Sequence, residues 1–126
     1  MHSSRLYRKF ALLVLGAVAI SVLATTPALA GKRFRLQRTG QERCSVTPNP
    51  VVNGNQYWVL GAGFAPGISV EIHTSGAVFF GSTLSDGTFA AWDWANFTYA
   101  GGKTVYVYQM GDPRMTVLAT CTFSSN

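Results

Sequence analysis

The sequence predicts an all-β fold, a sandwich of about seven strands formed by residues 44 to 126. Three observations indicate this fold class. Turn residues punctuate the region about every ten positions, the segments between them are rich in β-branched and aromatic residues, and no segment has convincing helical periodicity. Helices are therefore expected to be almost absent from this region.

The start of the chain has the pattern of an export signal. Basic residues are followed by an apolar run over residues 11 to 24 and by the small-residue end Ala28-Leu29-Ala30. This run is shorter than the ~20 apolar residues that span a bilayer, so cleavage after Ala30 is expected rather than a retained membrane anchor. We therefore predict a signal peptide over residues 1 to 30, a secreted or cell-envelope location, and no transmembrane segment in the mature chain.

Residues 31 to 43 are predicted to form a short, flexible, basic arm. They hold five basic residues against Glu42, whereas acidic residues outnumber basic ones from Cys44 onward. A solvated spacer is the favoured interpretation, because charge runs are commonly solvated tails, and contact with an anionic cell surface is the alternative. A nucleic-acid-binding domain would carry its basic residues on the folded surface, so nucleic acid is not an expected partner.

The first two strands are predicted over residues 44 to 47 and 56 to 62. Proline cannot donate to a β-ladder, so Pro48 ends the first strand. In the second strand, successive side chains alternate between faces. If Tyr57 and Val59 face the core, Trp58 and Leu60 must point outward.

The next three strands are predicted over residues 68 to 74, 77 to 84 and 88 to 94. Pro66-Gly67 suits the centre of a type II turn before the third strand, in which Val70 and Ile72 face inward and leave Glu71 and His73 outside. Asp86-Gly87 is a strong hairpin signal between the fourth and fifth strands.

The last two strands are predicted over residues 103 to 110 and 115 to 123. In the former, Val105 and Val107 take one face while Tyr106 and Tyr108 take the other. In the latter, the residues that share the core face are Val117, Ala119, Cys121 and Phe123.

The two cysteines, Cys44 and Cys121, are predicted to form a disulfide. Disulfides persist in the oxidising compartments that an exported chain reaches, and both cysteines lie on predicted strands at the two ends of the domain. The bond would close a loop of about 78 residues, worth roughly 4 to 5 kcal/mol in the chain-entropy model. Two unpaired buried thiols are the alternative.

Three short motifs carry a resemblance to a known family. They are Ser45-Val46-Thr47-Pro48-Asn49-Pro50, Gly61-Ala62-Gly63-Phe64-Ala65-Pro66-Gly67 and Ser85-Asp86-Gly87-Thr88-Phe89. Together they resemble bacterial immunoglobulin-like modules of the IPT/TIG kind, found in exported proteins. The resemblance implies an immunoglobulin-like sandwich and a bacterial source, and it implies little about function because one scaffold carries many roles. Such modules usually accompany other domains, whereas one copy stands alone in this sequence.

No catalytic or metal-binding constellation is evident, so an enzyme is not expected. His73 is the one histidine beyond the signal, without an evident partner, and both cysteines are expected to be oxidised. Asp86 and Asp112 sit in turn contexts, whereas Asp93, between two tryptophans, is either an exposed strand residue or a carboxylate against aromatic walls. The ligands for zinc are too few, and no cofactor is predicted.

The aromatic residues give the one functional hint. The candidate binding residues, whose rings are expected to be exposed, are Trp58, Trp92, Trp94, Tyr106 and Tyr108. Exposed rings can stack on sugars or meet a protein partner, since large exposed apolar patches usually mark contact sites. The alternative is that Trp92 or Trp94 fills the core, as a tryptophan does in many sandwiches.

The predicted function is therefore that of a non-catalytic extracellular binding or interaction module. A cell-surface glycan or an envelope protein is the expected partner. The second hypothesis is a structural, envelope-associated protein that self-associates or is anchored through edge strands and the basic arm. The sequence leaves the oligomeric state open.

Overall fold

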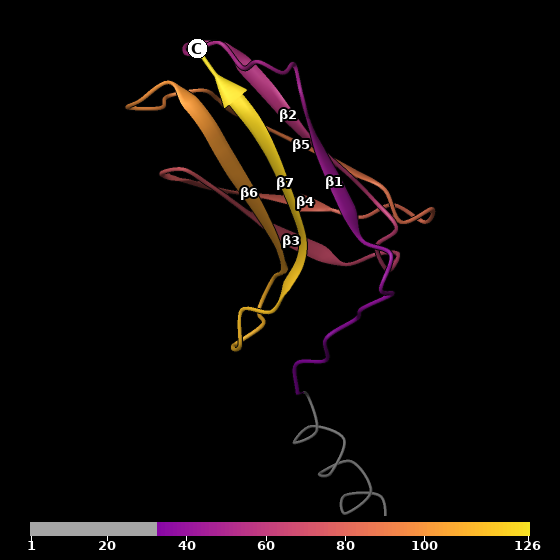
Figure 1. Ribbon diagram of the computed structural model, residues 1–126. Helices are drawn as coiled ribbons and strands as arrows, with labels where there is room; N and C mark the ends of the chain where they lie inside the picture. Colours follow the sequence, from indigo (N-terminus) through magenta and orange to yellow (C-terminus); the bar gives the residue numbers. More distant parts are fainter. Residues whose placement is uncertain (1–32) are drawn as a thin grey trace, which may run out of the picture. The chain divides into compact units, whose positions relative to one another are not determined.

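A computed structural model describes residues 33–126 (Figure 1), so the predicted signal peptide lies outside the described residues. Seven strands and no helix form this part of the chain. The strands are β1 (Arg43–Thr47), β2 (Gln56–Ala62), β3 (Ser69–Thr74), β4 (Ala77–Ser82), β5 (Phe89–Trp94), β6 (Gly101–Gln109) and β7 (Val117–Ser125). The predicted all-β fold is confirmed, with every strand within two residues of its expected bounds. Within residues 33–126 there is accordingly no helix long and apolar enough to cross a membrane.

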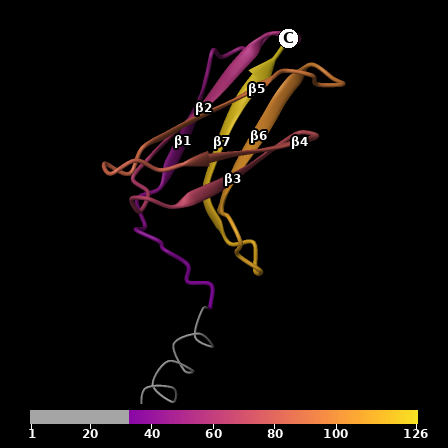
Figure 2. The same cartoon turned by 180° about the vertical axis from the view of Figure 1, so that it is seen from behind.

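The strands form two antiparallel sheets, seen from both sides in Figures 1 and 2. One sheet has the order β1-β2-β5 and the other β4-β3-β6-β7. In a constant-type antibody domain the fourth strand pairs with the fifth, whereas here β4 pairs with β3. The arrangement is compatible with an immunoglobulin-like sandwich whose fourth strand has changed sheets.

Tyr57 on β2 occupies the centre of the core. Its side chain is fully buried, and the centroid of its ring lies 6.0 Å from that of Phe79, 5.7 Å from that of Phe97 and 5.8 Å from that of Phe123. The other large, fully buried side chains are Val51, Val59, Val70, Ile72, Val105 and Val107. Four aromatic rings thus fill the middle of the sandwich without a tryptophan.

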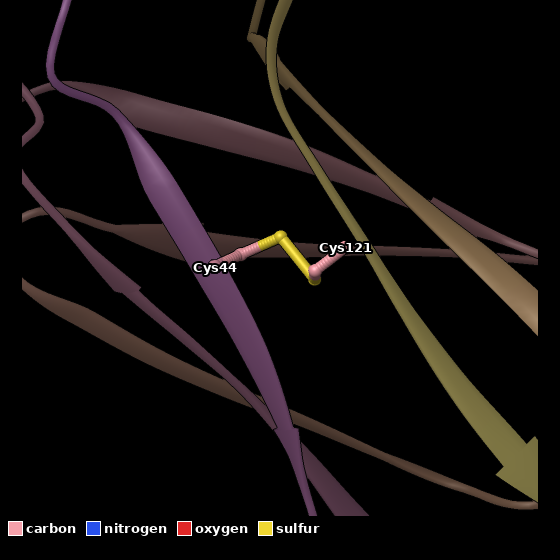
Figure 3. Close-up of a disulfide and its surroundings, with 2 residues drawn as sticks. All are labelled: Cys44 and Cys121. Atoms are coloured by element: carbon pink, nitrogen blue, oxygen red, sulfur yellow. A yellow bond between two sulfur atoms is a disulfide. The ribbon is translucent and has the colours of Figure 1, made fainter.

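The predicted disulfide between Cys44 and Cys121 is confirmed (Figure 3). The two Cα atoms are 5.6 Å apart, within the usual range for a bridged pair. Cys44 lies on β1 and Cys121 on β7, and each of these is the edge strand of its own sheet. The bond therefore ties the two sheets together along one open side of the sandwich.

Two expectations about connections and faces were wrong. Asp86-Gly87 forms a turn, but not a hairpin, because β4 pairs with β3 and β5 pairs with β2. Val117 does not share the core face: the ladder between β6 and β7 shifts between Val107 and Tyr108, and Leu118 is buried instead. A β-bulge of this kind reverses the alternation, and spacing in the sequence does not reveal it.

Residues 35 to 42 of the expected arm contact the sandwich without forming a strand. The Gln109 side chain accepts a hydrogen bond from the Gln37 N–H (2.7 Å) and donates one to the Arg35 carbonyl oxygen (3.1 Å). The Thr39 hydroxyl donates to the carbonyl oxygen of Gly63. These bonds hold this part of the chain beside the end of β2 and the end of β6.

Candidate binding site

Trp58, Trp92 and Trp94 form one cluster, here called the tryptophan platform, on the outer face of the β1-β2-β5 sheet. Trp58 and Trp92 are partners across β2 and β5, and Trp94 lies two residues further along β5 on the same face. The ring centroids of Trp58 and Trp92 are 6.3 Å apart, and those of Trp92 and Trp94 are 6.0 Å apart. The platform contains every tryptophan of the chain.

The platform is open to solvent. Trp92 is 46% exposed and Trp94 59% exposed, while Trp58 between β1 and β5 is half-buried. The alternative that Trp92 or Trp94 fills the core is therefore wrong. The tryptophans lie outside the core because the ring cluster around Tyr57 already fills the space between the sheets.

The residues opposite the platform in the β-ladder are uncharged. Thr47 lies opposite Trp58 on β1, and Gln56 lies opposite Trp94 on β2. Leu60, which is 39% exposed, extends the apolar surface along β2. Thr47, Gln56 and Leu60 therefore offer hydroxyl, amide and apolar groups but no charge.

Tyr106 and Tyr108 lie on the opposite side of the molecule, on the outer face of the β4-β3-β6-β7 sheet. Tyr106 is 42% exposed and Tyr108 is half-buried, so both rings point outward as predicted. The five candidate residues are thus divided between two faces, since β2 and β5 belong to one sheet and β6 to the other.

The face that carries the two tyrosines also holds a contact between His73 and Glu71 that the sequence analysis missed. His73 Nε2 lies 3.4 Å from Glu71 Oε1, and the imidazole ring packs edge-on against Tyr108 with centroids 4.8 Å apart. His73, for which no partner is evident in the sequence, thus lies beside Glu71. Residues two apart in a strand share a face, and this spacing could have revealed the pair. Val78 and Phe80 on the neighbouring β4 are exposed beside it.

Asp93 matches the second of the two alternatives, a carboxylate against aromatic walls. It lies opposite Tyr57 in the ladder, so it occupies an inward position at the end of β5, and it is half-buried. There it lines a pocket of about 330 Å³ at the end of the sandwich. The pocket is formed by Tyr57, Ser75, Gly76, Ala77, Asp93, Trp94, Asn96 and Phe97.

Two other carboxylates have the turn roles that the sequence predicted. Asp86 Oδ1 accepts hydrogen bonds from the N–H and the hydroxyl of Thr88, and these bonds lower the pKa of Asp86. Asp112 accepts from the N–H groups of Thr116 and Arg114 (2.9 Å each), and the bond from Thr116 contributes most to lowering the pKa of Asp112. Both groups shape loops rather than a reaction centre.

The part of the chain that the structure describes contains no group of three or more histidine, cysteine, aspartate or glutamate side chains placed to hold a metal ion. Within residues 33–126, His73 and Glu71 form the one contact between a basic and an acidic side chain. The chemistry offered by the two outer faces and the pocket is therefore aromatic stacking, hydrogen bonding and a single free carboxylate.

Comparison with protein-family models gave no match for the chain, and comparison with curated protein sequences gave none either. The structure shows an all-β sandwich with a disulfide, and the comparisons assign the chain to no family.

Proposed function

We propose that this protein is a non-catalytic binding module that recognises carbohydrate through the tryptophan platform. The observation that carries the proposal is the contiguous cluster of three indoles, two of them about half exposed, on one sheet face. Exposed indole surface is unfavourable in water, and contiguous apolar patches of this kind usually mark contact sites.

The uncharged cross-strand neighbours of the platform suit a sugar. A sugar ring offers an apolar C–H face for stacking and hydroxyl groups around its rim. Trp58, Trp92 and Trp94 supply the stacking surface, and Thr47 and Gln56 lie beside it with hydrogen-bonding side chains.

The angles between the rings favour a soluble chain over a flat crystalline surface. The planes of Trp58 and Trp92 meet at 50°, and those of Trp92 and Trp94 meet at 90°. Three rings without a common plane cannot all lie flat on one crystal face. A flexible oligosaccharide can place successive sugars against successive rings.

The test is a fluorescence titration of the purified protein with a panel of soluble cell-wall and storage polysaccharides. All three tryptophans belong to the platform, so intrinsic emission reports on this surface alone. We expect quenching or a blue shift on binding. The Trp92→Ala variant should bind roughly two- to tenfold more weakly, because Trp92 is the central indole of the platform and aromatic stacking is worth roughly 0.5 to 1.5 kcal/mol per pair.

The matched control is Tyr106→Ala, which removes an exposed ring from the other sheet face. It should bind as the unmodified protein does. Equal weakening by the two substitutions, or no change of emission with any polysaccharide of the panel, would contradict the proposal.

The place of the protein in the cell is part of the same proposal. The disulfide between Cys44 and Cys121 is consistent with an oxidising, extracytoplasmic compartment. The seven-strand sandwich is compatible with the bacterial IPT/TIG-like modules that the sequence motifs resemble. Detection of the mature chain, beginning at Gly31, in the culture medium or envelope fraction would support secretion after cleavage of the signal peptide.

A second candidate function is self-association through the other face. Val78 and Phe80 are 51% and 57% exposed on β4, and β4 is an edge strand whose outer side has no partner strand within residues 33–126. Unprotected edge strands with apolar side chains can pair with another copy. Sedimentation velocity over a wide concentration range tests this candidate, and a protein that stays monomeric at the highest concentration would rule it out.

A further inference from the structure

The pocket that contains Asp93 lies directly beside the tryptophan platform. Trp94 belongs to both: its ring is in contact with Trp92 on the platform, and it also lines the pocket. The turn Ser75-Gly76 between β3 and β4 forms the facing wall. A chain bound across the platform can therefore place one unit in the pocket.

Within the described residues, no basic side chain is in contact with the Asp93 carboxylate. The Tyr57 hydroxyl, which also lines the pocket, hydrogen-bonds with Thr74 Oγ1 (3.2 Å). Lys103, whose ammonium lies over the Phe97 ring, donates to the carbonyl oxygen of Tyr99 (2.6 Å). The one contact between a basic and an acidic side chain within the described residues lies elsewhere, between His73 and Glu71.

The walls of the pocket suit a cation. Three aromatic residues, Tyr57, Trp94 and Phe97, line the pocket together with a single carboxylate, and no lysine or arginine lines it. Aromatic rings attract ammonium groups, most strongly where water is partly excluded. Burial raises the pKa of Tyr57, and the nearby Asp93 charge adds to this effect, which agrees with a partly dehydrated, negatively charged site.

The size of the pocket suits one sugar unit. Its volume of about 330 Å³ is at the lower end of the ~300 to 1,000 Å³ range of small-molecule sites. Asn96 and Ser75 add neutral hydrogen-bonding groups at the rim. A single ring with an ammonium substituent and hydroxyl groups matches this lining.

We propose that the Asp93 pocket is a subsite for a protonated amino sugar, and that it selects glycans carrying a free amine. This inference rests on the proposed function, because the tryptophan platform must hold the rest of the glycan. The amine pairs with the Asp93 carboxylate and lies against Trp94, whereas an N-acetylated sugar has no charge to offer and brings a bulkier group.

The experiment compares two soluble oligomers of equal length, one of glucosamine and one of N-acetylglucosamine, with the purified full chain at pH 5.5. We expect the glucosamine oligomer to bind at least tenfold more tightly. The Asp93→Asn substitution should abolish this difference, and Asp86→Asn, which removes a carboxylate from a loop outside the pocket, should preserve it. Circular dichroism checks that each variant is folded.

A measurement on the unmodified protein gives an independent test. Raising the salt concentration should weaken binding of the glucosamine oligomer and leave the N-acetylglucosamine oligomer unaffected, because only the first uses a charge pair. Equal affinity for the two oligomers, unchanged by Asp93→Asn, would overturn the subsite while leaving the platform in place. Failure to bind either oligomer would overturn the subsite, and a failure with the whole polysaccharide panel would overturn the platform as well.

Binding of tetralysine tests whether the pocket requires a sugar ring or accepts any ligand with an ammonium group. Tetralysine carries amines without sugar rings, so it should bind at least tenfold more weakly than the glucosamine oligomer and should not displace it. If tetralysine binds with the same affinity as the glucosamine oligomer, and if this binding depends on Asp93, the assignment to an amino sugar is overturned.

Discussion

At the scale of single residues, close approaches inside the sandwich decide which side chains are allowed. Gly61 on β2 lies against the ring of Phe89, and a Cβ atom at position 61 would overlap that ring. Phe89 itself is buried and packs edge-on against Phe64, with ring centroids 5.1 Å apart. Glycine is therefore required at position 61 because the neighbouring ring occupies the space of its missing side chain.

We expect Gly61→Ala to lower the free energy of unfolding by about 1 to 3 kcal/mol, the usual cost of overpacking a core. Gly102→Ala is the matched control, since nothing lies within 4 Å of the added methyl group. Urea unfolding of both variants measures the difference. Adding Phe89→Leu to Gly61→Ala should restore part of the loss, and a double variant no more stable than Gly61→Ala would contradict this explanation.

At the scale of elements, the turn between β6 and β7 depends on one carboxylate. Asp112 is buried, and its two oxygens accept the N–H groups of Arg114 and Thr116. Asparagine has one acceptor oxygen, so Asp112→Asn leaves one of these N–H groups without its partner. The turn and the bulged start of β7 both lie next to this side chain.

The pKa of Asp112 is lower in the folded protein than in the unfolded chain, so its stabilising contribution is present above pH ~4 and disappears as the pH falls through the folded pKa. We therefore expect Asp112→Asn to lower the thermal midpoint at pH 7 and to have a progressively smaller effect below pH 4. Thermal unfolding at pH 7, 5, 4 and 3 measures this. An effect of equal size at pH 7 and pH 3 would show that the charge is unimportant.

At the scale of the whole molecule, the disulfide joins the edge strands β1 and β7 of the two sheets. Cys44 and Cys121 are 77 residues apart in the chain, so the bond closes nearly the entire domain into one loop. β1 and β7 also lie side by side in both views (Figures 1 and 2). The bond restricts the conformations of the unfolded chain far more than it changes the folded sheets.

Replacing both cysteines by alanine is expected to lower the free energy of unfolding by about 4 to 5 kcal/mol, the value for a loop of this length in the chain-entropy model. Equilibrium unfolding in urea measures the loss, and reduction of the unmodified protein should reproduce most of it. A double variant as stable as the oxidised protein would mean that strain offsets the entropic gain.

Much of this arrangement was determined by the sequence alone. Turn residues and alternating apolar positions define strands from residue 43 onward, because a two-residue period and glycine or proline conformations are local properties of the chain. The same alternation predicted that Trp58, Tyr106 and Tyr108 point outward. The pairing of Cys44 with Cys121 followed from their even count and their positions on the first and last strands.

Tertiary structure alone decided the rest. Two features depend on how strands pair with one another, which cannot be read from any one segment of the sequence. One is the sheet that β4 joins, and the other is the burial of Leu118 in place of Val117. The sequence left open whether a tryptophan or another ring fills the core, since that choice depends on how Tyr57, Phe79, Phe97 and Phe123 fit together. Because those rings fill the space between the sheets, Trp92 and Trp94 remain outside, and Asp93 between them faces the pocket instead.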